Sequence, residues 1–507
     1  MIIKVYNTLS GKKESLPRPV DKPLRLFVCG PTVYNLSHIG HARIYIFFDI
    51  FVRYLKSLGY KIFYLQNITD IDDKIINRAK KMGISPLKLA QEETRVYFND
   101  MKSLGIKNVK YAPATKFIPQ IAKQVQVLIR KSYAYEIPSD GYYFDIKKFK
   151  DYGKLSHRTL EQAEDAVSRI DESIKKKNKG DFALWKIADA KNANKYANDA
   201  KKKFKIINGE PLWKTSLGWG RPGWHIEDTA IADHYFGQQY ELHGGGLDLK
   251  FPHHEAEIAQ AEAASGKKPF VKIWMHVGLL NVAGEKMSKS LGNFITIQDF
   301  LKKHSANVLR FIIASNHYRS PLDYQEDAAK SASAALNSLQ EFIAKLELIK
   351  KSGIRDQGFR DYSLSKVEEI HYNGNPSINS GSKLESGIKI KIPKYEKQFS
   401  EAMTDDMNTP RALAEVFNLV NDANKSIWNL NKTQAGIINK WLLSKLAIFG
   451  ITLSLPKIPK KVQDLVKKRE LLRSNKQFTQ ADALRKKITA LGYRVEDTPL
   501  GPLVLKN

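Results

Sequence analysis

The most constraining feature of the sequence is a strand, helix and strand pattern within its first 70 residues. Leu24–Cys29 and Lys61–Gln66 are short apolar runs typical of strands, and His38–Leu58 between them has the periodicity of a helix. This order predicts a βαβ unit with parallel strands. The connecting loop contains Gly30 and ends in Ser37, a suitable N-cap, so a helix N-terminus that can bind phosphate is expected at the end of the first strand.

The chain has 507 residues, which is more than one hydrophobic core usually serves, because cores seldom extend past roughly 250–300 residues. Strand and helix signals return between Trp213 and Phe311, after a looser, lysine-rich stretch, and the chain beyond Asp323 is rich in helix-forming residues. The predicted organisation is an α/β nucleotide-binding domain over 1–323 with an insertion at about 105–215, a helical bundle over 324–455 with a flexible loop at about 371–387, and a basic C-terminal module over 456–507.

The charge balance indicates a polyanionic partner. Lys and Arg number 82 against 53 Asp and Glu, which gives a net charge of +29 and a field that attracts nucleic acid. The last 51 residues alone hold 13 basic and 5 acidic side chains. A solvated lysine surface, or a generally basic proteome, is the alternative explanation.

The single cysteine, Cys29, rules out an intramolecular disulfide and favours the cytoplasm as the location. The sequence contains no run of 18 apolar residues and no apolar N-terminal core with a cleavage site. We therefore expect neither a membrane-spanning segment nor export by a signal peptide.

Two short motifs carry candidate chemistry. His38-Ile39-Gly40-His41 places two imidazoles three residues apart on one helical face, and the glycine between them leaves room for a ligand. Far downstream, Lys286 and Lys289 lie in a glycine-flanked loop at 284–293, where lysines can neutralise charge on a departing pyrophosphate. Taken alone, the histidines are also consistent with a capped helix start, and the lysines with an ordinary surface loop.

Together the two motifs, HIGH and KMSKS, resemble those of class I aminoacyl-tRNA synthetases, and further stretches are similar to the cysteinyl-tRNA synthetases in particular. These stretches, in the order of that family, are CGPTVYNLSHIGHAR (29–43), NITDIDDKII (67–76), DYGKLS (151–156), DFALWK (181–186), GRPGWHIED (220–228), HGGGLDLKFPHHEAEIAQ (243–260) and EKMSKSLGN (285–293). The resemblance implies a Rossmann-like parallel-sheet catalytic domain with an insertion, followed by an α-helical bundle and a small C-terminal anticodon-binding segment.

The resemblance implies a zinc ion at the base of the cysteine pocket, with ligands that map onto Cys29, Asp228, His253 and Glu257. Asp228 stands where the bacterial pattern has cysteine, as in archaeal-like members of the family. Carboxylate in place of thiolate keeps the net ligand charge and remains suitable for zinc. The alternatives are a weakened site, an Asp228 that only bonds a neighbouring group, or Glu227 as a less suitable substitute ligand.

The remaining site residues also follow from the resemblance. His38, His41, Lys286 and Lys289 would be catalytic, and ATP would be bound by Gly40, His41, Gly245, Asp248 and Lys289. The cysteine pocket would be lined by Cys29, Thr69 and Trp224, although Trp224 is equally consistent with plain core. Arg469, Arg473, Arg485 and Asp497 would contact tRNA. In the family a tryptophan commonly follows the motif that contains Asp497. Here it is missing, because Gly501-Pro502-Leu503-Val504 stands there.

The implied function is a ligase that activates L-cysteine with ATP and Mg²⁺ and transfers it to the 3′ end of tRNA(Cys), acting as a monomer. One rival is the related ligase that joins cysteine to an amino sugar, which would need no anticodon module. The other is an inactive paralogue that only binds RNA, for which Asp228 would be the lesion. Intact HIGH and KMSKS motifs and a basic C-terminal segment favour the ligase that acts on tRNA.

Overall fold

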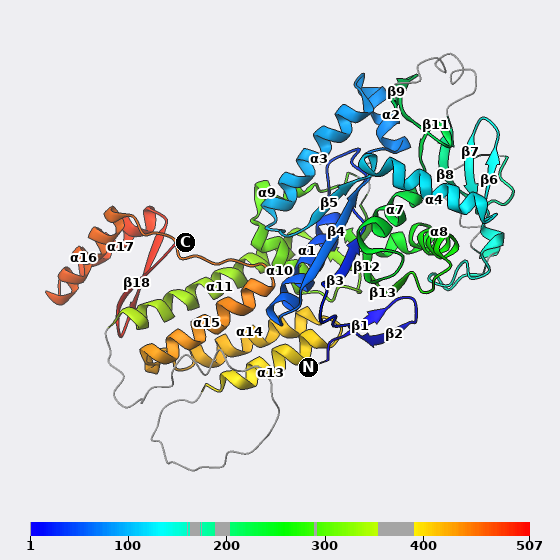
Figure 1. Ribbon diagram of the computed structural model, residues 1–507. Helices are drawn as coiled ribbons and strands as arrows, with labels where there is room; N and C mark the ends of the chain where they lie inside the picture. Colours follow the sequence, from blue (N-terminus) through cyan, green and yellow to red (C-terminus); the bar gives the residue numbers. More distant parts are fainter. Residues whose placement is uncertain are drawn as a thin grey trace, which may run out of the picture. The chain divides into compact units, whose positions relative to one another are not determined.

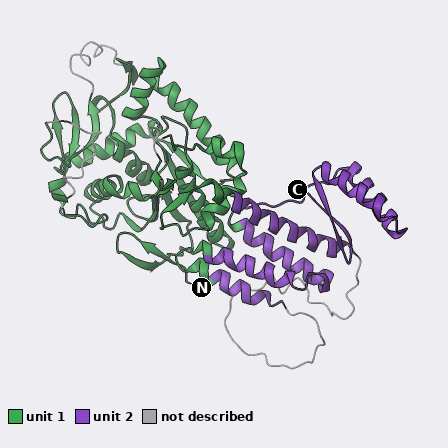
Figure 2. Ribbon diagram, turned by 180° about the vertical axis from the view of Figure 1, so that it is seen from behind, with its two compact units in different colours: residues 1–329, 401–410, 448–450 green, residues 330–400, 411–447, 451–507 purple. Residues whose placement is uncertain are grey.

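The computed structural model describes residues 2–159, 161–162, 173, 175–187, 203–287, 292–352 and 390–506 (Figure 1). Lys289, the predicted loop at 371–387 and most of the lysine-rich stretch before residue 203 lie outside these residues. The chain divides into two compact units, shown in Figure 2, which are described separately. Unit 1 comprises 1–329, 401–410 and 448–450, and unit 2 comprises 330–400, 411–447 and 451–507.

Unit 1 is built on a parallel sheet of five strands in the order β13-β12-β3-β4-β5. The strands are β3 (Leu24–Val28), β4 (Ile62–Ile68), β5 (Lys110–Pro113), β12 (Tyr240–Gly246) and β13 (Val271–Val277). The chain runs outward from β3 in one direction and later returns to its other side through β12, so the strand order reverses between β3 and β12. Ligands of open α/β sheets bind at such a point, beyond the carboxyl ends of the strands.

Helices cover both faces of this sheet, and two successive glycines on β12 show how. A Cβ on Gly244 would lie against the Phe48 ring of α1 (Ile39–Ser57), whereas a Cβ on Gly245 would lie against His254. Because successive strand residues point to opposite faces, α1 covers one face. The other face packs against α4 (Ile118–Arg130), α7 (Trp224–Phe236) and α8 (Glu255–Ser265), which share one core with Phe27 and Leu65. The predicted βαβ unit and Rossmann-like fold are confirmed.

The insertion in unit 1 contains an antiparallel sheet that the sequence patterns did not predict. Its strands lie in the order β6-β7-β8-β11-β10-β9 among the described residues (Figure 1). They are β6 (Ala134–Ile137), β7 (Gly141–Phe144), β8 (Phe182–Ile187), β9 (Phe204–Ile207), β10 (Glu210–Thr215) and β11 (Gly218–Pro222). The last strand leads directly into α7, so the insertion delivers Trp224 and Asp228 to the main sheet.

Shorter elements complete unit 1. They are the hairpin β1 (Lys4–Asn7) and β2 (Lys12–Ser15), the small sheet of β14 (Leu280–Val282), β15 (Glu285–Lys286) and β16 (Leu322–Tyr324), and the helices α2 (Asp73–Met82), α3 (Pro86–Ser103), α9 (Ile297–Lys303) and α10 (Ala306–Ala314). The buried Asp406 joins the 401–410 segment to the rest of the unit. Its carboxylate accepts hydrogen bonds from Tyr6 N at 2.8 Å, Tyr318 Oη at 2.7 Å and Arg319 Nε at 2.8 Å.

In the residues that the structure describes, unit 2 is helical apart from a C-terminal hairpin. Its elements are α11 (Glu326–Lys351), α13 (Ile392–Thr404), α14 (Thr409–Asn424), α15 (Lys432–Ile448), α16 (Lys460–Ser474), α17 (Phe478–Ala490), β17 (Tyr493–Thr498) and β18 (Gly501–Lys506). A small core of Val462, Val466, Ile488 and Val495 holds α16 and α17 to the hairpin. No helix in the described part of the chain is long and apolar enough to cross a membrane.

Candidate active site

A cluster of four buried metal-binding groups lies at the carboxyl end of β3. Cys29 follows this strand, Asp228 comes from the first turns of α7, and His253 and Glu257 flank the start of α8. Cys29 Sγ is 3.4 Å from Asp228 Oδ2, and His253 Nε2 is 3.0 Å from Asp228 Oδ2 and 3.2 Å from Glu257 Oε1. One donor atom from each of the four lies within 4.8 Å of the others. The four residues predicted as ligands are therefore brought together.

The charges of this cluster call for a cation. Burial raises the pKa of the Cys29 thiol, and the carboxylates of Glu257 and Asp228 raise it further. Burial also raises the pKa of Glu257, with Asp228 adding to the effect. Asp228 Oδ1 and Glu257 Oε2 are buried without a hydrogen-bond partner among the described residues. A thiol, an imidazole and two carboxylates suit zinc, whose charge would lower the pKa of such ligands and would satisfy the unpaired oxygens.

Two further histidines extend the cluster. His243 Nε2 and His254 Nε2 lie 3.2 Å and 3.1 Å from Cys29 Sγ, so that Cys29, His243, His254 and Glu257 form a second possible donor set. The other ring nitrogen of each is held: His243 Nδ1 by Tyr240 Oη at 2.6 Å, and His254 Nδ1 by His276 Nε2 at 2.8 Å. Such contacts fix the orientation of metal-binding imidazoles.

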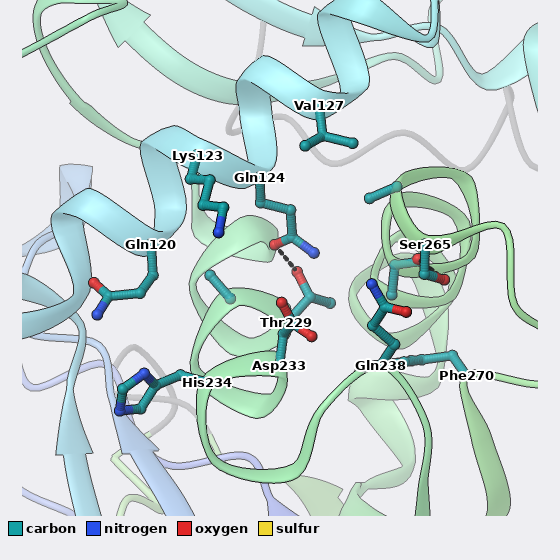
Figure 3. Close-up of a pocket in the computed structure, with 13 residues that line it drawn as sticks. Gln120, Lys123, Gln124, Val127, Thr229, Asp233, His234, Gln238, Ser265 and Phe270 are labelled. Atoms are coloured by element: carbon teal, nitrogen blue, oxygen red, sulfur yellow. Dashed lines mark hydrogen bonds between the residues drawn. The ribbon is translucent and has the colours of Figure 1, made fainter.

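His253 is held in a similar way by a chain of polar groups. Its Nδ1 lies 2.7 Å from His225 Nδ1, and the Gln260 amide donates both to the His225 carbonyl and, at 2.9 Å, to Thr229 Oγ1. Thr229 in turn donates to Gln124 Oε1 at 3.0 Å, as Figure 3 shows. Thr229 and Gln124 line a separate cavity of about 280 Å³ between α4, α7 and the end of α8, which includes none of the cluster donors.

The two histidines of HIGH lie together at the start of α1. His38 is the N-cap and accepts from Gly40 N at 3.1 Å, and its ring stacks on His41 at 3.9 Å. Burial lowers the pKa of His38 to about 3, with a further contribution from His41, and burial lowers that of His41 to about 4. Both imidazoles are thus neutral at pH 7, so they can donate hydrogen bonds to a phosphate but carry no charge.

The start of the KMSKS loop approaches the same helix. A Cβ on Gly40 would lie 2.9 Å from Cε1 and Nδ1 of the His38 ring and 2.9 Å from Met287 Cε, so a side chain here would displace the His38 ring. The chain that follows the loop is anchored beside HIGH, since Ile39 N donates to Ile295 O at 3.1 Å and Ile297 N to Ser37 O at 2.9 Å. Lys286 is exposed on β15. The two motifs, more than 240 residues apart in the sequence, therefore meet.

Of the predicted pocket residues, Trp224 contacts the donor cluster directly, and Thr69 contacts Glu227, the neighbour of Asp228 in the sequence. The Trp224 ring stacks on the imidazole of His253, with centroids 4.2 Å apart. Thr69 Oγ1 donates to Glu227 Oε2 at 3.0 Å. Glu227 is fully buried, its Oε1 has no partner among the described residues, and burial raises its pKa, with Asp228 and Asp70 adding to the effect.

The predicted nucleotide-side residues Gly245 and Asp248 lie within and just beyond the carboxyl end of β12. The absence of a side chain at Gly245 makes room for the His254 ring, whose Cε1 would lie 2.8 Å from a Cβ there. Asp248 is exposed just beyond the strand, and its charge raises the pKa of His38 against the larger effect of burial. Asp248 therefore lies on the same side of the sheet as the HIGH histidines.

The residues predicted to contact tRNA lie in the C-terminal module. Arg469 is 0% exposed and donates to both oxygens of Asp497, at 2.7 and 2.9 Å. The same carboxylate is 3.5 Å from Arg473, and Arg485 donates to the Val495 carbonyl. Arg469 is thus placed to hold Asp497 rather than to reach a ligand itself.

The sequence reasoning overlooked several groups of this site. His243 and His254 were passed over, although both lie within a quoted matching stretch, and Glu227 was considered only as a substitute metal ligand. The paired histidines at 253 and 254 gave a usable signal, since two adjacent imidazoles before an acidic helix are uncommon. No local pattern indicated that His243, within β12, would lie beside Cys29.

Comparisons with known proteins agree with this geometry. A family model described as "tRNA synthetases class I (C) catalytic domain" matches residues 17–334, and one described as "DALR domain" matches 398–454. The cysteine–tRNA ligase of Thermococcus onnurineus is 40% identical over 513 residues, covering 99% of both chains. That of Aquifex aeolicus is 38% identical over 531 residues, covering 99% of this chain and 98% of the relative.

Solved structures show the same fold at low identity. Mycobacterium tuberculosis methionyl-tRNA synthetase with methionyl-adenylate has a TM-score of 0.55 at 13% identity, covering 85% of this chain and 90% of that one. The Agrobacterium radiobacter leucyl-tRNA synthetase in a ternary complex also has a TM-score of 0.55, at 10% identity, covering 85% and 84%. Given its match to the catalytic-domain model and the full-length identity to curated relatives, the chain belongs to the cysteine–tRNA ligases, a family of class I tRNA synthetases.

Proposed function

We propose that this chain joins L-cysteine to the 3′ end of tRNA(Cys), using ATP to form cysteinyl-adenylate first. The observation that carries the proposal is the convergence of the buried donor cluster around Cys29 with the His38 and His41 pair at the switch point of the sheet. The donor cluster suits recognition of a thiol amino acid, and the histidine pair suits phosphate. The reaction takes place in the cytoplasm, and the enzyme acts as a monomer.

The donor cluster would hold one zinc ion through Cys29, Asp228, His253 and Glu257. When bound, zinc supplies a soft Lewis acid that prefers the substrate thiolate over the hydroxyl of serine. A purely apolar pocket separates near-isosteres by only about 10²-fold, so metal coordination is the stronger means of selection. The oxygen donor of Asp228, in place of a second protein thiolate, leaves Cys29 as the one sulfur ligand from the chain.

The pocket next to the cluster would orient the amino acid. Glu227 presents a buried carboxylate oxygen with no partner among the described residues, and an α-ammonium group is a suitable donor for it. Thr69 fixes the other oxygen of this carboxylate. Trp224 closes the apolar side of the pocket and keeps the His253 ring in place by stacking. By binding the α-ammonium group, Glu227 would leave the carboxylate of the substrate cysteine free to react.

Activation requires the cysteine carboxylate to attack the α-phosphate of ATP while pyrophosphate leaves. His38 and His41, both neutral, would donate hydrogen bonds to the phosphates without a change in protonation. Lys286 and Lys289 would neutralise the departing pyrophosphate together with Mg²⁺. Gly40, Gly245 and Asp248 would border the nucleotide. Positioning and charge stabilisation supply most of the catalysis in this scheme.

The C-terminal module over 456–507 would bind the anticodon, after the catalytic domain over 1–323 and the helical bundle over 324–455. Its excess of basic side chains supports this role, and Phe478 is 55% exposed at the start of α17, where its ring can stack on an unpaired base. Arg473, Arg485 and Asp497 would contact the tRNA, with Arg469 positioning Asp497. Stacking on the Phe478 ring would compensate for the missing C-terminal tryptophan.

Cysteine-dependent exchange of pyrophosphate with ATP, followed by charging of tRNA(Cys), tests the proposal. We expect exchange with cysteine and none with serine at equal concentration. Exchange without charging of any tRNA, but with transfer to an amino sugar, would support the amino-sugar ligase instead. Absence of exchange in a metal-loaded, RNA-binding protein would support the inactive paralogue.

A further inference from the structure

An exposed lysine lies between two aromatic rings beside the candidate cysteine pocket. Lys74 Nζ is 5.8 Å from the centroid of the Tyr34 ring and 5.7 Å from that of Trp224. Both distances are within the range of a cation–π contact. Trp224 stacks in turn on His253 of the donor cluster, so the Trp224 ring lies between the Lys74 ammonium group and this cluster donor.

The charge of Lys74 is free to act on a ligand. Among the described residues its ammonium group has no hydrogen-bond or ion-pair partner, and only its backbone N–H bonds a carboxylate, that of Asp72 at 2.8 Å. Its neighbour Asp73 is neutralised by Lys186 at 2.7 Å and by Arg221. Tyr34 is 36% exposed, so part of its side chain is accessible to solvent. An accessible ring next to an unpaired ammonium group is the usual combination for a single-stranded nucleotide.

Helix α2 continues this positive charge away from the pocket. Lys74, Arg78 and Lys81 are spaced four and three residues apart, so they lie on one face of the helix. Lys74 and Lys81 are exposed, and Arg78 is half-buried with its Nε inside the protein. The stripe extends over about 10 Å, given a rise of ~1.5 Å per residue. Such a row follows a strand of phosphates rather than one small anion.

We propose that Tyr34 and Lys74 bind the 3′-terminal nucleotide of the tRNA, with the base on the Tyr34 ring and the phosphate on Lys74. Arg78 and Lys81 then contact the phosphates of the nucleotides that precede it. The inference rests on the proposed function, in which the terminal ribose must reach the activated carboxyl group beside Trp224. A free nucleotide would not contact Arg78 and Lys81, because it lacks the preceding phosphates.

The test separates activation from transfer. Lys74→Gln and Tyr34→Leu are compared with the parent enzyme in cysteine-dependent pyrophosphate exchange and in single-turnover transfer from preformed adenylate to tRNA(Cys). Stacking and charge contacts of this kind predict a loss of transfer efficiency of roughly five- to a hundredfold. Lys80→Gln removes the same charge from another face of α2 and is the matched control, for which transfer at the parental rate is expected.

A second measurement compares tRNA that ends in CCA with tRNA that lacks the terminal adenosine, each as a competitive inhibitor of charging. The parent enzyme is expected to prefer the complete end, and Tyr34→Leu to lose that preference. A raised KM for cysteine in the exchange reaction of Lys74→Gln would assign the lysine to the amino acid and overturn the proposal. Parental transfer by both variants would overturn it as well, while exchange by the parent would leave the proposed function standing.

Discussion

The assignment of Asp228 as a metal ligand leads to a quantitative prediction. Asp228→Asn keeps the size of the side chain but removes its charge. Zinc sites of four protein ligands bind with about 10–16 kcal/mol, so one ligand contributes about 2.5–4 kcal/mol if the four are equal. The loss also removes a carboxylate that raises the pKa of Cys29 and Glu257, which makes these two easier to ionise. We therefore expect Asp228→Asn to weaken zinc binding by about 2.5 kcal/mol, the lower end of this range, which is roughly 70-fold in affinity.

Competition with a chromophoric chelator at pH 7.5 measures this affinity directly. Asp233→Asn is the matched control, because Asp233 is exposed on the same helix and is absent from both donor sets. We expect unchanged zinc binding for the control. For Asp228→Asn we expect weaker binding together with poorer rejection of serine in pyrophosphate exchange.

Parental zinc affinity in Asp228→Asn would refute the reasoning. The ion would then be held by the second donor set, and His254→Gln would lower the affinity instead. Loss of zinc with unchanged rejection of serine would separate metal binding from selectivity. In that case the geometry of the pocket, and not the thiolate contact, would choose the amino acid.

Three further predictions concern single sites. Gly40→Ala places a Cβ 2.9 Å from the His38 ring and from Met287 Cε, so it should displace the His38 imidazole and slow adenylate formation about 10²-fold, measured by exchange, without changing thermal stability. Arg310→Met removes a buried guanidinium bonded to Asp49 Oδ2 at 2.6 Å and should destabilise unit 1 by about 3 kcal/mol in urea unfolding. Burial raises the pKa of Asp100 from 3.8 to about 6, so stability falls as pH rises from about 4 to 6. Asp100→Asn should remove this pH dependence. Above pH 6 the free energy of unfolding of the variant should exceed that of the parent by about 1.5 kcal/mol, which is half of what the full pKa shift would give because the carboxyl group is partly hydrated. Below pH 4 the variant should gain nothing.

The main features of the fold were predictable from local patterns. The strand at 24–29 and the helix at 38–58 correspond to β3 and α1 within one or two residues, because their apolar periodicity matches their burial. The antiparallel sheet of the insertion was not predictable. Its strands are four to six residues long and lie among lysine-rich segments, and strands this short leave little periodicity to detect.

The candidate site was predictable only in part, for a spatial reason. Family motifs identified Cys29, Asp228, His253 and Glu257, which the structure places within 4.8 Å although they span 229 positions of the chain. His243 was missed because its proximity depends on β12 lying next to β3, and strand order cannot be derived from local periodicity. Similarly, the sequence does not show that Arg469 turns into the core of its module.

The solitary thiol of the chain offers a reporter that needs no engineering. Cys29 is 4% exposed, so a maleimide should leave the native, metal-loaded enzyme unlabelled and should modify one equivalent per chain after denaturation. Intermediate labelling would then measure the fraction of molecules whose pocket has opened or lost its ion. Mass spectrometry of the intact protein would give that fraction from two peaks, and every labelled molecule would be labelled in the pocket.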